Sequence, residues 1–107
     1  MGSSRSMAVL VLEGRTTVEI LLAGDLDLDA DAVLEPVLAG ILEDPRIQRI
    51  VIDAAMTTFC DSSGLTALIR AQRRAAARGV RLGLARPSLR LRRVLAATGL
   101  LETLVDR

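Results

Sequence analysis

Apolar residues near the start of the chain follow the alternating pattern of β-strands. Two β-type runs, 7–14 and 16–24, meet at a Gly-Arg step, and the second alternates around Val18 and Ile20 before turning fully apolar. This pattern predicts a β-hairpin that turns near residues 13–15.

The pattern then changes to a helical period. Over residues 30–42 apolar side chains recur at intervals of three and four, which predicts an amphipathic helix with a wide apolar stripe. A helix that begins near Asp31 places Pro36 close to its first turn, whereas a helix that begins at Asp27 would be kinked there. The Asp44–Pro45 pair ends the element.

Further strands and helices alternate in the rest of the chain. Residues 47–54 predict a short strand, and its continuous apolar centre predicts burial on both faces of a sheet. The following predicted elements are a helix over 63–78, a strand over 80–85 and a helix from Ser88, its N-cap, through Thr98. The last segment, 100–105, has no assigned element. The order β-β-α-β-α-β-α over 107 residues predicts one α/β domain with right-handed crossovers onto a shared sheet.

Composition narrows the class of protein. Half of the residues are hydrophobic and Phe59 is the only aromatic residue, so we expect an aliphatic core. No apolar run approaches the roughly 18–20 residues of a membrane-spanning helix, and no secretory leader is present, so a cytoplasmic protein is expected. Residues 1–6 resemble a cloning remnant or a disordered N-terminus. Cys60 is the only cysteine, which excludes an internal disulfide and a cysteine metal cluster.

The net charge of +1 hides an uneven distribution. Residues 1–64 hold eleven acidic side chains and four arginines, a balance of −7, whereas residues 65–107 hold ten arginines and two acidic side chains, a balance of +8. A basic half can bind nucleic acid. Here the arginines fall on the polar positions of predicted elements, with no aromatic residues for base stacking, so we expect solvated faces and no direct nucleic-acid or membrane partner.

The sequence FCDSSGL, residues 59–65, joins a predicted strand to a predicted helix. Asp61, Ser62 and Ser63 therefore fall at a helix start, where the first backbone N–H groups lack partners and Asp or Ser is a preferred cap. One cap explains only one of these three side chains.

The residue types that the chain lacks exclude a catalytic or metal-binding role for this junction. The chain has neither histidine nor lysine, so no Ser-His-Asp triad or Ser-Lys pair can activate a serine. GLTALI lacks the glycines and lysine of a phosphate-binding loop. The alternating acids at 25, 27, 29 and 31 lack the glycine and distal glutamate of a calcium loop. We therefore expect no enzyme activity, no cofactor and no metal.

A hydroxyl at a helix start can instead accept a phosphate from another protein. The phosphate adds about −1.5 to −2 charges. The helix end partly accommodates this charge, whereas the neighbouring Asp61 opposes it. An acidic partner group that docks there would be repelled, and a loss of a few kcal/mol weakens affinity roughly a hundredfold or more.

Three segments together resemble the STAS domain family, and in particular its bacterial anti-sigma factor antagonists. That family shows G-E-L-D after a strand, then F-x-D-S-[ST]-G-L, then a late L-x-x-x-G-L. The matching segments here are GDLD at 24–27, FCDSSGL at 59–65 and LAATGL at 95–100. The resemblance covers roughly residues 8–105.

The resemblance implies both a fold and a switch. The fold is a single small domain over 7–107, with a mixed sheet of four or five strands and helices mainly on one side. The unphosphorylated protein would bind an anti-sigma factor, often also a serine kinase, and so free a sigma factor. Phosphorylation would end this binding, and a serine phosphatase would reset it.

The resemblance also implies roles for individual residues. The phosphoacceptor carries over to Ser62, which leaves Ser63 as the cap or a secondary acceptor. Asp27 matches a family aspartate at the kinase-facing surface. The remaining residues assigned to partner contact are Asp61, Gly64, Leu65 and Thr66.

Two alternatives stay open. Many STAS domains are phosphorylation-independent scaffolds or subunits of signalling or transport assemblies, although those often lack the paired serines. Cys60 replaces a residue that is commonly aliphatic in the family, and it is either a small apolar filler or a redox sensor.

Overall fold

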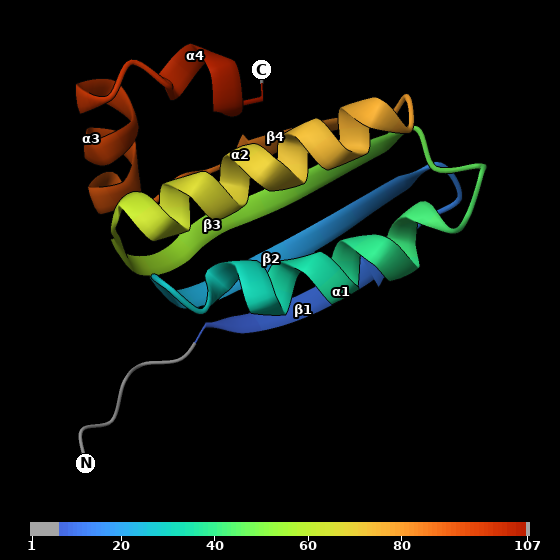
Figure 1. Cartoon of the computed structure of the whole chain (residues 1–107), viewed down its shortest axis with the longest axis horizontal. Helices are drawn as coiled ribbons and strands as arrows, with labels where there is room; N and C mark the ends of the chain where they lie inside the picture. The colour runs from blue at the N-terminus through green and yellow to red at the C-terminus, as the bar shows by residue number, and fades with distance from the viewer. Residues whose placement is uncertain (1–6, 107) are drawn as a thin grey trace.

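The computed structural model describes residues 7–106, and its elements follow the predicted order (Figure 1). The expectation for residues 1–6 lies outside the described residues. The elements are β1 (Ala8–Glu13), β2 (Thr17–Leu26), α1 (Ala30–Leu42), β3 (Arg49–Cys60), α2 (Ser62–Ala77), β4 (Arg81–Ala85), α3 (Leu89–Ala97) and α4 (Leu101–Leu104).

The four strands form one mixed sheet in the spatial order β1-β2-β3-β4. β1 and β2 form the predicted antiparallel hairpin, closed by the Gly14 N–H, which donates to the Thr17 carbonyl at 2.9 Å. The pairs β2–β3 and β3–β4 are parallel, as strands joined through helices usually are. Beyond β4, Val105 makes one parallel bridge to Leu84. The α/β class and the mixed sheet are thus confirmed.

Helices α1 and α2 lie side by side across one face of the sheet, while α3 and α4 lie beside β4 and the end of β3 (Figure 1). The core between the layers is aliphatic, as the composition predicts. Its largest fully buried side chains are Ile20, Leu22, Leu26, Leu34, Leu38, Ile50, Ile52, Leu68, Leu84, Leu91, Leu95 and Leu104. Burial of this apolar surface, at about 25 cal/mol per Å², is the main force that holds the helices on the sheet.

The third strand differs from its prediction in length and in burial. It extends to Cys60 instead of ending near residue 54, because two shifts in its pairing with β2 let residues 56–59 continue the ladder. Burial along its first half alternates, with Ile50 and Ile52 buried and Val51 only half-buried. The prediction of burial on both faces is therefore wrong, because α1 and α2 cover one face only.

α1 begins at Ala30, between the two predicted starts, so Pro36 lies in the helix interior. Proline lacks an N–H, which leaves the carbonyl of Ala32 without its usual helical partner. Ala32 and Pro36 are both exposed, so water can satisfy that carbonyl.

In the C-terminal third of the chain, the predicted helix cap is confirmed and the segment without a predicted element proves to be helical. Ser88 caps α3, as predicted, since its Oγ accepts the Leu91 N–H at 3.2 Å. The unassigned segment 100–105 forms the single turn α4 and then the bridge at Val105.

Packing of α1 against α2 brings part of the acidic and basic halves of the sequence together. Asp31 of α1 accepts a hydrogen bond from Arg70 of α2 at 3.2 Å. One turn further along, Glu35 lies 3.6 Å from Arg74. These exposed pairs contribute about 0–1 kcal/mol each, so they align the helices more than they stabilise them.

Candidate functional site

Ser62 and Ser63 lie at the junction between the end of β3 and the start of α2. The Asp61 N–H donates to the Leu26 carbonyl at 3.2 Å, which joins the end of β2 to this turn. The Asp61 side chain accepts the Gly64 N–H at 3.0 Å and is therefore the N-cap of α2. The prediction of Ser63 as a possible cap is wrong, because Ser62 and Ser63 are the first two residues of the helix.

Gly64 lies against the end of β2. A Cβ at this position would lie 2.1 Å from the Leu26 carbonyl oxygen and 2.6 Å from its carbon. Only a residue without a side chain allows α2 to approach β2 this closely. The glycine thus sets the position of the serines that precede it.

The hydroxyl residues at the start of α2 differ in accessibility. Ser62 and Thr66 are exposed, whereas Ser63 is half-buried. The Thr66 hydroxyl donates to the Ser62 carbonyl at 2.8 Å, a bond within the helix that leaves the Ser62 hydroxyl at the surface. Gly64 and Leu65 are buried, so the partner role predicted for these two residues would act through the shape of the turn.

The GDLD segment organises the neighbouring turn before α1. The Asp27 side chain accepts the Asp29 N–H at 3.1 Å, and the Asp27 carbonyl accepts the Ala30 N–H at 3.0 Å. Asp25 accepts the Thr58 hydroxyl at 2.7 Å and so ties the end of β2 to β3. The role of Thr58 was not predicted, because the long extension of β3 that brings it within hydrogen-bond distance of Asp25 was not predicted either.

Exposed large apolar side chains occur on segments near this end of the sheet and, at Leu10 and Leu12, on the edge strand β1; the sequence pattern did not indicate them. The exposed fraction is 79% for Leu28, 69% for Met56, 44% for Phe59 and 66% for Leu89. They come from the turn before α1, the second half of β3 and the first residue of α3. Leu89 is held near β3 because the Ser88 N–H donates to the Ala54 carbonyl at 3.0 Å and the Ser88 and Thr57 hydroxyls bond at 2.8 Å.

Cys60 precedes the serines and is half-buried. Burial, and then the charge of Asp61, raise the pKa of the Cys60 thiol to about 11. Its Sγ lies 3.5 Å from the Asp61 carbonyl, to which the S–H donates. Since the thiolate is the reactive form, this environment favours a filler over a redox sensor.

We expect iodoacetamide to alkylate Cys60 slowly in the folded protein. The rise of the pKa from an ordinary 9.0 to about 11 lowers the thiolate fraction at pH 8 about a hundredfold. Mass spectrometry of native and urea-unfolded protein would give the two rates. Equal rates at pH 8 would contradict the filler interpretation.

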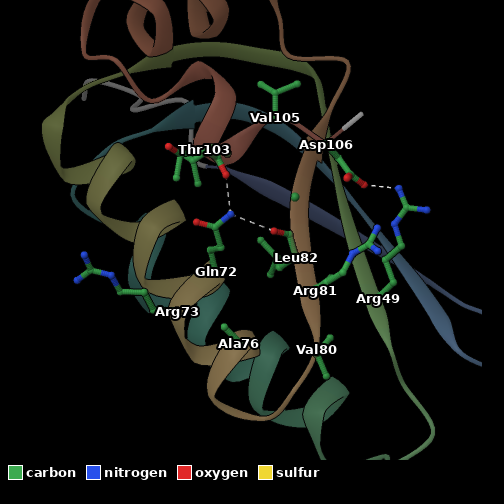
Figure 2. Close-up of a pocket in the computed structure, with 12 residues that line it drawn as sticks. Arg49, Gln72, Arg73, Ala76, Val80, Arg81, Leu82, Thr103, Val105 and Asp106 are labelled. Carbon is green, nitrogen blue, oxygen red and sulfur yellow. Dashed lines mark hydrogen bonds and ion pairs between the residues drawn. The ribbon is translucent and has the colours of Figure 1, made fainter.

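A concave region of about 430 Å³ lies at the outer edge of β4, away from the serines (Figure 2). There Gln72 of α2 donates to the Leu82 carbonyl at 3.2 Å and to the Thr103 carbonyl at 2.8 Å. On the other side of β4, Arg49 pairs with Asp106 (Figure 2). These contacts attach the C-terminal segment to α2 and the sheet, and none of them involves the serine turn.

Among residues 7–106, no group of three or more His, Cys, Asp or Glu side chains is arranged to hold a metal ion. None of the helices in this range combines the length and hydropathy that crossing a bilayer requires.

Several solved structures resemble the chain over most of its length. The anti-sigma factor antagonist SpoIIAA in its unphosphorylated form is 29% identical, with a TM-score of 0.70 over 94% of this chain and 88% of that chain. The phosphorylated form of the Bacillus cell fate determinant SpoIIAA is 27% identical, with the same TM-score, over 94% and 91%.

A more distant structure shares the fold alone. An anti-sigma factor antagonist from Mycobacterium paratuberculosis is 23% identical, with a TM-score of 0.76 over 97% of this chain and 87% of that chain. No curated protein sequence matches the chain. The family model described as "Mlab, STAS domain" matches residues 9–106, which is nearly the whole chain. The chain therefore belongs to the STAS domain family.

Proposed function

We propose that this protein is an anti-sigma factor antagonist, active when Ser62 is unphosphorylated. The observation that carries the proposal is the exposed Ser62 at the first position of α2, within a D-S-S-G turn that Asp61 and Gly64 fix. The likeness to SpoIIAA, of which both an unphosphorylated and a phosphorylated form are known, supports the same conclusion. We also place the protein in the cytoplasm, where bacterial sigma factors act.

The surface around Ser62 suits reversible docking. Leu28, Met56, Phe59 and Leu89 offer apolar area at the same end of the sheet. Clustered exposed apolar side chains on a small domain mark interaction surfaces. Asp27, Asp61 and Thr66 supply polar contacts near the serine, so the proposed interface combines an apolar part with a polar one.

Phosphorylation of Ser62 would weaken the binding of a partner to this surface. In the proposed reaction the Ser62 Oγ attacks the γ-phosphorus of ATP bound by the partner kinase, the bond to the β-phosphate oxygen breaks and ADP leaves. The hydroxyl proton passes to a base of the kinase, because the chain has no histidine or lysine of its own. The new dianion lies beside Asp61 and Asp27, where it repels any acidic group of the partner and must be desolvated for docking.

Incubation with a partner kinase and ATP tests this function. The kinase is obtained by affinity capture from cell extract with Ser62→Ala protein as bait, and mass spectrometry then locates the phosphate on wild-type protein. We expect one phosphate at residue 62, with residue 63 as the secondary site. Recovery of a kinase that labels neither serine would refute the proposal.

A phosphorylation-independent scaffold is the second candidate. Two observations favour it: the matching family model bears the name Mlab, and the murine anion transporter Slc26a9 contains a domain of this fold, 15% identical with a TM-score of 0.73 over 92% of this chain and 19% of that chain. In that case the capture experiment would recover transport or scaffold proteins without a kinase, and Ser62→Asp protein would retain them equally well.

A further inference from the structure

The two serines of the motif have different surroundings, although they are adjacent. Ser63 lines a cavity of about 270 Å³ between the first turns of α1 and α2, together with Leu28, Asp31, Thr66, Ala67 and Arg70. Ser62 is exposed and does not line this cavity.

Helix geometry aligns Ser63, but not Ser62, with Arg70. Residues 63 and 70 are seven apart, which is close to two full turns and about 10 Å of rise, so they share one face of α2. A long side chain on a helix leans toward the N-terminus, which directs the Arg70 guanidinium toward Ser63. Ser62 is rotated by about 100° from that face.

Arg70 is the one cation among the residues that line this cavity. Its Nη1 lies 3.2 Å from Asp31, the one carboxylate in the lining. The adjoining turns add only acids, namely Asp27 and Asp29 before α1 and Asp61 before α2. A phosphate near Ser63 would therefore have Arg70 as its counter-charge, in surroundings that otherwise repel it.

We propose that Arg70 makes the two serines unequal as phosphorylation sites. A phosphate on Ser63 takes Arg70 from Asp31, because a phosphate dianion binds a guanidinium through two hydrogen bonds and carries more charge than a carboxylate. The guanidinium then compensates about half of the phosphate charge inside the cavity. A phosphate on Ser62 keeps its full charge on the docking surface.

The inference rests on the proposed function and sharpens it. Ser62 is the effective switch, because its phosphate projects its full charge toward a partner, whereas Arg70 compensates part of the charge of a phosphate on Ser63. Phosphorylation of Ser63 has a smaller effect on partner binding. Its main effect is to release Asp31 from Arg70 and so break one of the two ion pairs between α1 and α2.

Phosphoserine inserted during translation, at residue 62 or at residue 63, allows a test without any kinase. Titration of each protein by ³¹P NMR gives the second pKa of the phosphate, which is near 6 when no charge is close. We expect this pKa to be lower at residue 63 than at residue 62, by about half a pH unit or more, because a nearby guanidinium favours the dianion. Arg70→Gln should remove most of the difference.

Arg74→Gln is the matched control. Arg74 forms the same kind of cross-helix ion pair, with Glu35, one turn further from the serines. The Arg74→Gln substitution should leave the pKa values of both phosphates unchanged. Arg70→Lys keeps the positive charge, so it should preserve part of the pKa difference that Arg70→Gln removes.

The proposal is overturned if the two phosphates titrate alike, or if their difference survives Arg70→Gln. Because translation installs the phosphoserine, either result leaves the kinase experiment on Ser62 unaffected. Conversely, a kinase that fails to label Ser62 would not alter these titrations.

Discussion

Gly64→Ala protein is expected to lose about 3 kcal/mol of its free energy of unfolding. The added Cβ would lie 2.1 Å from the Leu26 carbonyl oxygen, a backbone atom that cannot move unless β2 or α2 moves. Overpacking of this kind typically costs 1–3 kcal/mol, and displacement of the Asp61 cap adds about 1 kcal/mol. Urea denaturation followed by circular dichroism measures the loss directly.

Gly40→Ala provides the matched control for this prediction. Gly40 lies within α1, is exposed, and has no atom within 4 Å of the position of an added Cβ. Alanine should therefore raise the free energy of unfolding there, by about 0.5–1 kcal/mol, because it restricts the unfolded chain and favours helix. A Gly64→Ala protein as stable as wild type would show that α2 does not depend on its close approach to β2.

Ser62→Asp protein is expected to bind its anti-sigma factor at least tenfold more weakly than wild type, whereas Ser62→Ala protein should bind as tightly as wild type. The aspartate adds one negative charge to a surface that already carries Asp27 and Asp61, and a tenfold loss corresponds to about 1.4 kcal/mol. The alanine removes only an exposed hydroxyl that the docked state need not use. Isothermal titration calorimetry with the captured partner gives both affinities.

Thr103→Asp controls for the added charge itself. Thr103 is an exposed residue of α4, beside Gln72, which lies ten residues and so about 15 Å along α2 from Ser62. Its substitution should leave the affinity unchanged. Equal losses for Ser62→Asp and Thr103→Asp would point to a general effect of net charge and away from a docking surface at Ser62.

The elements were predictable where one local signal dominated. The period of the apolar residues identified α1 and α2, and the Gly-Arg step between two alternating runs identified the hairpin. Ser88 was recognised as a cap because the first turn of a helix depends on its own side chains. The serine turn was found in the same way, since Asp61 caps α2 within a few residues of Ser62.

What the sequence did not reveal depends on contacts between distant segments. The extension of β3 to Cys60 follows from its pairing with β2 through two shifts in register, which no local pattern encodes. The sequence alone does not show that Gly64 lies against Leu26 of β2, which is the contact that requires a glycine there. The cavity that separates Ser63 from Ser62 likewise forms only when Asp31 of α1 packs against Arg70, 39 residues away.

The most direct test of the switch compares the affinity of the captured anti-sigma factor for unmodified protein and for protein with phosphoserine at residue 62. We expect the phosphate to weaken binding about a hundredfold, which is about 2.7 kcal/mol, because it places an unneutralised dianion on the docking surface. Equal affinities for the two forms would contradict the account, and Ser62 would then be an exposed helix residue without control over docking.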